Sequence, residues 1–106
     1  MPKYLWEVSY STEGSRGLIK DGGTKRRAAV EKALSGIGGK LDAFYYAFGR
    51  HDLIAIVDFP NNISVAGASL AVTSTGAATI RTTVLLTPEE IDAATKQKLA
   101  YRAPGK

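Results

Sequence analysis

The sequence predicts a single α+β domain: a four-stranded antiparallel sheet in the ferredoxin-like βαββαβ order, followed by an extra C-terminal helix. Three observations predict this fold. Four segments have the alternation or β-branched content of strands, helical stretches follow the first and third of them, and a tight turn joins the second to the third. The length of 106 residues suits one domain. We therefore assign residues 1–106 to that domain, with residues 101–106 as a frayed tail.

The first strand is followed by a helical arm. Residues 3–10 alternate with a period of two, which is typical of a strand. One face of this strand carries the side chains of Tyr4, Trp6, Val8 and Tyr10. Residues 12–37 are predicted as one arm that is interrupted at Gly22-Gly23 and restarted with Thr24 as the cap. The second part of the arm has one apolar stripe, formed by Val30, Ala33, Leu34 and Ile37.

The second and third strands are expected to form a hairpin. Residues 40–48 are rich in aromatic side chains, and residues 53–59 in aliphatic ones. The short turn from Gly49 to Asp52 joins them, which favours an antiparallel pair.

A helix, a strand and a terminal helix complete the chain. Asn61 or Asn62 can cap a helix whose apolar residues repeat at helical spacing until about Gly76. Residues 78–86 are β-branched and predict the fourth strand. The sequence Thr-Pro-Glu-Glu at 87–90 has the cap, the proline and the acidic residue that begin a helix, which we expect to reach about residue 100.

The central strands are apolar on both faces, and this predicts a partner. The two main helices of such a fold cover one face of the sheet, so the other face of a monomer is expected to be polar. Leaving aliphatic side chains there in water forgoes about 1.5–3 kcal/mol each. We therefore expect a homodimer or higher homo-oligomer, a dimeric α+β barrel in which two sheets pack face to face. The candidate interface residues are Phe44, Phe48, Ile54 and Ile56.

The C-terminal helix is an alternative cover for the open face. Residues 88–100 offer only Ile91, Ala94 and Leu99 for that contact, so the second copy of the chain is the preferred interpretation.

Composition excludes several kinds of chemistry. The chain has no cysteine, so disulfides, thiolate catalysis and cysteine-based metal sites are excluded. One histidine and scattered acids predict no metal site, and no cofactor is expected. No apolar run approaches the roughly 18 residues of a membrane span, and the N-terminus lacks a secretory signal, so we predict a cytoplasmic protein without membrane contact.

The net charge is +4, and much of it lies at positions 25–27 and in the tail. A solvated helix face and a basic tail are preferred over a nucleic-acid site, because no aromatic residues are interleaved with the cations.

Aromatic and basic residues are the candidates for binding a small organic or anionic ligand. Tyr4, Trp6 and Tyr46 can line a pocket for a flat molecule, the alternative being that they pack in the core. Arg26 lies in a run of cations at a helix start, where the helix dipole favours an anion. The alternative is that these cations are solvated or contact a neighbouring subunit.

The turn and two strand carboxylates are the remaining candidates. His51 can act as an acid or base near neutral pH, but Asp52 points away from it on an extended chain. The alternative is an exposed histidine beside an aspartate that binds nearby backbone. Glu7 and Asp58 interrupt apolar strands, so each is a buried base with a raised pKa, an acid paired with Arg81, or an acid exposed at a strand end.

The turn from Gly49 to Asp52, followed by Leu-Ile-Ala-Ile-Val-Asp-Phe-Pro-Asn, resembles the GYD domain family of small bacterial proteins. The similarity extends over about residues 3–95 and includes the segment Thr-Val-Leu-Leu-Thr-Pro-Glu-Glu. The family is similar to the dimeric α+β barrel proteins, which include isomerases, cofactor-free monooxygenases, haem-handling enzymes and binding proteins. The resemblance implies a dimer and no particular reaction. His51 stands where the family's turn has a tyrosine, which puts that tyrosine's role in doubt here.

Three functions remain open from the sequence. The first is a module that binds a small organic or anionic metabolite between sheet and helices. The second is a cofactor-free isomerase- or monooxygenase-like enzyme, and the third is a structural assembly unit. A cavity with a buried carboxylate in reach favours the enzyme, whereas a filled interior excludes both of the first two.

Overall fold

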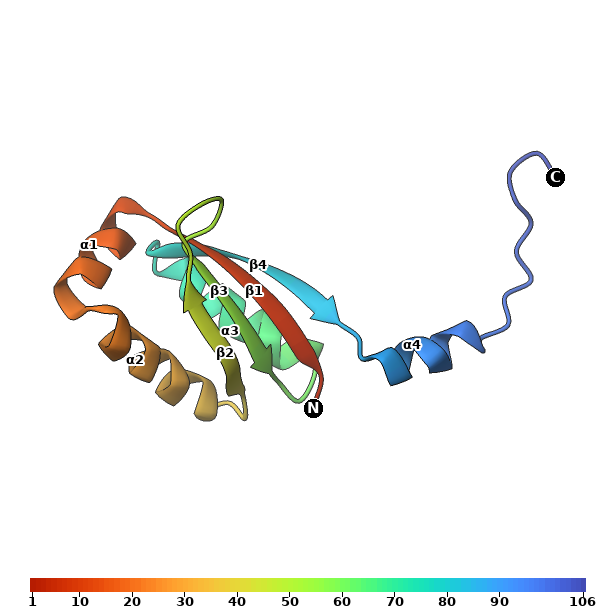
Figure 1. Ribbon diagram of the computed structural model, residues 1–106, viewed down its shortest axis with the longest axis horizontal. Coiled ribbons are helices and arrows are strands. Elements are labelled where there is room, and N and C mark those ends of the chain that lie inside the picture. The colour runs from red at the N-terminus through yellow and green to blue at the C-terminus, as the bar shows by residue number, and fades with distance from the viewer.

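The computed structural model describes residues 1–106 as one α+β body with a C-terminal arm that extends away from it (Figure 1). The elements are β1 (Lys3–Tyr10), α1 (Thr12–Asp21), α2 (Gly23–Ser35), β2 (Lys40–Tyr46), β3 (Leu53–Asp58), α3 (Asn62–Ser74), β4 (Ala78–Leu85) and α4 (Pro88–Thr95). The predicted order of strands and helices is confirmed.

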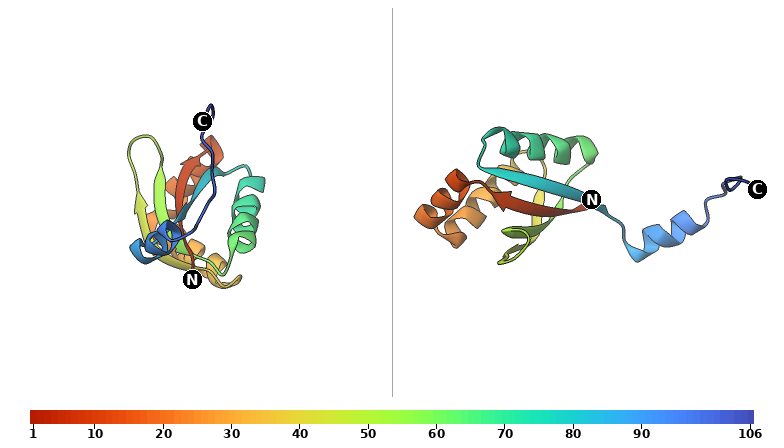
Figure 2. Two further views of the ribbon diagram at one scale, coloured as in Figure 1. Left: turned by 90° about the vertical axis from the view of Figure 1, so that its right-hand side faces the viewer. Right: turned by 90° about the horizontal axis from the view of Figure 1, so that it is seen from above.

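The sheet has the order β2-β3-β1-β4, and every neighbouring pair is antiparallel. This is the ferredoxin-like arrangement, in which β3 lies between β1 and β2. Helix α2 packs on β2 and α3 packs on β4, so the two cover one face of the sheet (Figure 2). The predicted fold class is confirmed for the chain: a four-stranded antiparallel sheet with helices on one side.

The alternation of β1 decides which residues enter the core. Tyr4, Trp6 and Val8 point toward the helices and are buried, whereas Leu5 and Glu7 lie on the opposite face. The buried core is completed by Leu34, Leu53, Ala55, Val57, Phe59, Val65, Ala68 and Ala78. The core therefore lies between the sheet and the two long helices, and the opposite face of the sheet, which we call the open face, has no covering element.

Three helices begin with a side-chain cap, and the caps of α3 and α4 are among those that the sequence predicts. Ser11 and Asn61 each accept a hydrogen bond from a backbone N–H of their helix, and Thr87 with Glu90 forms a complete capping box. The prediction that Thr24 caps the second part of the arm is wrong. Helix α2 begins two residues earlier than that cap implies, at Gly23, because Gly22 adopts a φ of 82° that lets the chain turn from α1 directly into α2.

The C-terminal helix is shorter than predicted and does not cover the sheet. It ends at Thr95 rather than near residue 100, and all its side chains are exposed. Figures 1 and 2 show α4 and the residues after it running away from the body. With no packed face, only its capping box and local hydrogen bonds hold this helix. The alternative in which it folds back over the open face is not seen.

Candidate functional site

A cavity of about 320 Å³ lies between α2, the C-terminal end of α3 and the helix-facing side of the sheet. Small-molecule sites begin at about 300 Å³, so this cavity can accept a small organic molecule. All but two of its lining residues are hydrophobic, the exceptions being Arg26 and Thr75. The others are Trp6, Val8, Tyr10, Ala29, Val30, Ala33, Leu34, Phe44, Leu53, Ala55, Val72, Ala77, Ala78 and Ile80.

Small side chains keep this space open. Helix α2 contributes Ala29 and Ala33 to the wall, and β3 contributes Ala55 beneath them. A methyl group at each of these positions leaves a gap that a leucine or phenylalanine would fill.

Arg26 is the only charged residue in the cavity wall. It is half-buried, whereas its neighbours Lys25 and Arg27 are exposed. Arg27 forms an ion pair with Glu31 at 3.4 Å, but Arg26 makes none. Of the three cations that the sequence placed at the start of this helix, the structure therefore brings one into the cavity.

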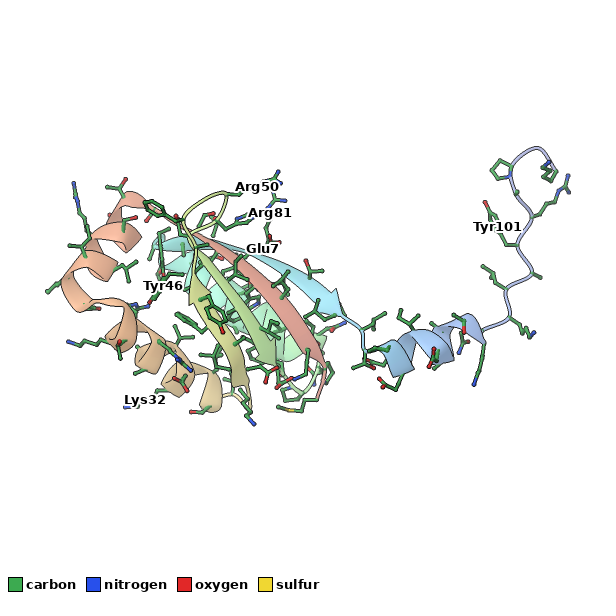
Figure 3. All side chains as sticks on the ribbon, in the orientation of Figure 1. Glu7, Lys32, Tyr46, Arg50, Arg81 and Tyr101 are labelled. Atoms are coloured by element: carbon green, nitrogen blue, oxygen red, sulfur yellow. The ribbon has the colours of Figure 1, made fainter.

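Two tyrosines stand near Arg26. Burial raises the pKa of Tyr10, and the proximity of Tyr46 raises it further, while the positive charge of Arg26 acts in the opposite direction. Burial also raises the pKa of Tyr46, again opposed by Arg26. The Tyr46 hydroxyl donates a hydrogen bond to the carbonyl of Gly23 at 3.0 Å, which joins β2 to the start of α2 (Figure 3). Both hydroxyls are therefore neutral donors at physiological pH.

Alkaline pH is expected to destabilise the protein through these tyrosines. Their pKa values are raised in the folded state, so the unfolded chain loses these protons first, from about pH 10. Stability is complete below that pH and falls as pH rises through the folded-state values. Absorbance at 295 nm should show tyrosines that ionise late, and Tyr10→Phe should remove part of this late change. An unaltered titration in that variant would contradict the assignment.

Trp6 lies in the cavity wall with an unsatisfied donor. Only 4% of its surface is exposed, and its indole Nε1 has no hydrogen-bond partner. An unpaired buried donor of this kind costs about 1–3 kcal/mol. Tyr4, the other aromatic candidate of β1, is a core residue that does not line the cavity. Its hydroxyl donates to Asn62 Oδ1 at 2.6 Å, and its ring packs against Phe59.

The side chains of Asp52 and His51 contact different parts of the protein, as expected for neighbours on an extended chain. The Asp52 carboxylate accepts a hydrogen bond from the backbone N–H of Tyr10 at 2.7 Å, which fastens the β2–β3 turn to the end of β1. His51 faces the open face, where its Nε2 lies 3.2 Å from Glu7 Oε2 and its Nδ1 3.4 Å from Ser9 Oγ. The structure thus pairs His51 with Glu7.

The two strand carboxylates are paired, though not with Arg81, which was one of the alternatives that the sequence left open. Arg81 lies opposite Glu7 in the register and near it in Figure 3, but no ion pair joins them. Asp58 accepts from Lys3 Nζ at 2.9 Å, and Lys3 also contacts Asp42 at 2.9 Å. These hydrogen bonds raise the pKa of Lys3, the contact with Asp42 most of all.

The interface candidates divide between the two faces. Ile54 and Ile56 lie on the open face beside Leu5 and Tyr45, so a patch of aliphatic and aromatic side chains is exposed there. The assignment of Phe44 to a sheet-to-sheet interface is corrected, because it is in register with Ala55 and lines the cavity. Phe48 lies beyond β2 in the turn and is fully exposed.

Sequence reasoning missed Tyr10 and Thr75 as wall residues. Tyr10 continues the alternation of Trp6 and Val8, a signal that was available. No sequence pattern identified Thr75, because its position in the cavity wall depends on where α3 ends relative to the sheet.

No group of three or more histidine, aspartate or glutamate side chains is arranged to hold a metal ion. None of the helices combines the length and the apolar character that crossing a membrane requires.

The fold and the cavity define a class: a ferredoxin-like α+β domain with a ligand-sized apolar space between sheet and helices. Within this class, the family model of the GYD domain matches residues 4–95, so the chain belongs to the GYD domain family. No curated protein sequence and no solved structure matches the chain.

Proposed function

We propose that this protein is a homo-oligomeric module that binds a small organic molecule in the cavity between sheet and helices. The observation that carries the proposal is the cavity itself, an apolar space of about 320 Å³ with one unpaired cation in its wall. A purely structural domain has no need of such a space, because filling it with larger side chains would add stability.

Binding is favoured over catalysis by the positions of the acids and bases. No carboxylate and no histidine lines the cavity. The His51–Glu7 pair, the one combination suited to proton transfer, lies on the open face, on the other side of the sheet. A ligand in the cavity would therefore meet hydroxyl, indole and guanidinium donors but no general base.

The open face supports self-association. Its middle is apolar, with Leu5, Ile54 and Ile56, while the Lys3–Asp58 and His51–Glu7 pairs lie toward opposite ends. An apolar centre with charged ends is the usual composition of an interface. A second copy presenting the same face would cover the apolar centre of both sheets.

A fluorescent probe tests the cavity. We expect 8-anilinonaphthalene-1-sulfonate to bind the wild-type protein saturably, with one molecule per chain and a rise in fluorescence. Ala33→Phe places a ring in the cavity wall and should weaken this binding at least tenfold. Ala28→Phe is the matched control, because Ala28 is on the same helix but does not line the cavity. Equal binding by both variants would place the probe elsewhere and overturn the proposal.

A further inference from the structure

We propose that helix α4 binds a second copy of this chain, on the β2–β3 turn (residues 47–52) of that copy. Ile91 of α4 packs against the partner's Phe48. The acidic side of α4 faces the partner's Arg50 and the partner's Arg81. Two such contacts form in a symmetric pair, one at each end of the stacked sheets. This inference rests on the self-association in the proposed function and names a further surface that it uses.

Helix α4 has strong start signals but no surface to pack on within its own chain. Its capping box and Pro88 define the first turn, whereas every one of its side chains is exposed. An isolated helix shorter than about 12–15 residues is marginal in water, and α4 has eight residues. The family match to residues 4–95 includes all of α4, so the helix belongs to the domain. Contact with another surface would therefore stabilise it.

Exposed apolar side chains lie at both places that the proposal brings together. Phe48 in the turn is fully exposed, and Ile91 of α4 is 46% exposed. Leu86, in the link that precedes α4, is exposed as well. Burying these side chains against one another would remove apolar surface from water, which is the main driving force of association.

The charge of α4 is entirely negative. The helix carries Glu89, Glu90 and Asp92 and no cation. Glu90 closes the capping box, where it accepts the backbone N–H of Thr87 at 2.8 Å. Glu89 and Asp92 are three positions apart, so they lie on one side of the helix. That side of α4 therefore suits a basic surface.

The turn end of the sheet is a basic surface of this kind. Arg50 and Arg81 are exposed, and neither forms an ion pair. Figure 3 shows both at the same end of the sheet, near Glu7. The acids beside them already have partners, since Glu7 pairs with His51 and Asp52 accepts the backbone N–H of Tyr10. Two arginines thus remain available to the acidic side of α4.

The contact cannot form within one chain. β4 ends at Leu85, opposite Lys3, whereas the turn lies beyond Leu53, which is opposite Val8. The five residues between these two levels span about 17 Å, and β3 lies two strand spacings, about 10 Å, to the side. Ile91 can be at most about 15 Å from Leu85, since only two residues link the strand to the helix. A second copy is therefore required.

The positions of α4 and the turn fit a copy stacked on the open face. Figure 2 shows both displaced to the side of the sheet opposite α3, and Figure 1 shows them at opposite ends of the strands. Two sheets that pack face to face lie about 10 Å apart. When their strands run antiparallel to each other, α4 of one copy lies beside the turn of the other.

Introduced cysteines test this arrangement, because the natural chain has none. We expect Phe48→Cys and Ile91→Cys chains, mixed and oxidised with copper–phenanthroline, to form a covalent dimer on a non-reducing gel. Each variant alone should form little, because the two copies of each position lie at opposite ends of the pair. Ile63→Cys is the matched control: Ile63 is exposed on α3, so its mixture with Ile91→Cys should give no dimer.

Charge reversal tests the electrostatic part. Glu89→Lys combined with Asp92→Lys is expected to weaken association at least tenfold, measured by sedimentation. Adding Arg50→Glu and Arg81→Glu to the same chain should restore most of the lost affinity, because opposite charges face one another again. Glu13→Lys is the control, since Glu13 lies in the first turn of α1 as Glu89 does in α4. It should leave association unchanged.

The outcomes separate this inference from the proposed function. Self-crosslinking of either single variant that equals crosslinking in the mixture would mean another arrangement and overturn the role of α4. An oligomer that shows neither the mixed crosslink nor an effect of charge reversal would also overturn it, while self-association stands. A chain that is monomeric at micromolar concentration would overturn both.

Discussion

Replacing Ile56 by aspartate is expected to dissociate the proposed homo-oligomer into monomers or to prevent folding. Ile56 lies on the open face between Leu5 of β1 and Ala43 of β2, at the centre of the apolar patch. In a symmetric pair each copy loses an aliphatic contact worth about 1.5–3 kcal/mol and gains a charge without a partner. The two losses together weaken association at least about a hundredfold. Native mass spectrometry and sedimentation at micromolar concentration measure this directly.

The control is the same substitution on the helical side of the molecule. Ile63 is exposed on α3, so Ile63→Asp introduces the same charge without touching the open face. This variant should keep the oligomeric state of the wild type. If the wild-type chain is a stable monomer at micromolar concentration, self-association through the open face is wrong. The proposed binding of a ligand in the cavity would be unaffected by that result, since the cavity lies on the other side of the sheet.

Replacing Gly14 by alanine is expected to destabilise the fold by about 2 kcal/mol or more. A Cβ atom at this position would lie 2.1 Å from the carbonyl oxygen of Ala77 and 3.0 Å from the ring of Tyr10. The carbonyl cannot move easily, because it accepts hydrogen bonds from the backbone and the hydroxyl of Ser11. Helix α1 must therefore shift away from Ala77, and urea unfolding at neutral pH measures the resulting loss of stability.

Gly17 supplies a control on the same helix. No atom lies within 4 Å of a Cβ built there. Gly17→Ala should stabilise the protein by about 0.5–1 kcal/mol, because alanine loses less backbone entropy than glycine when a helix forms. Gly14→Ala is thus expected to lower the free energy of unfolding and Gly17→Ala to raise it. Equal effects of the two substitutions would mean that the close approach of α1 to Ala77 does not exist in solution.

The Gly14→Ala variant also tests whether the position of helix α1 affects the cavity. Tyr10 and Ala77, the two residues that the added methyl group would meet, both line the cavity between the sheet and the helices. A displaced α1 is expected to change the shape of the cavity near Arg26 and Tyr10. Weaker binding of 8-anilinonaphthalene-1-sulfonate should therefore accompany the loss of stability, whereas Gly17→Ala should bind this probe as the wild type does.

The candidate site was only partly predictable from sequence, and the reason is geometric. Trp6, Arg26 and Tyr46 were named because aromatic and basic side chains suit an organic anion, and the structure places all three around α2 and the sheet. Tyr4 has the same chemistry and the same strand face but lies in the closed part of the core. Sequence spacing fixes the face of a strand on which a side chain lies, and it carries no information on where along that face a cavity opens.

His51 and Asp52 also show which features could be predicted from the sequence and which depended on the folded structure. The sequence indicated that His51 and Asp52 point apart, because successive side chains of an extended chain alternate. Only the folded sheet brings Glu7, 44 positions before His51 in the chain, to 3.2 Å from its ring. The pairing requires the register of β1 with β3, which is a long-range property.

By itself, the sequence determined the order of the elements, the helix cap at Thr87, and the apolar character of both sheet faces. These features depend on residues that are close together in the chain, so local periodicity and capping chemistry suffice. The tertiary structure alone decided that alanines on α2 and β3 face one another across an unfilled space and that Arg26 enters it. Cavities, ion pairs and close approaches such as that of Gly14 arise from the distance between packed elements, which no local pattern encodes.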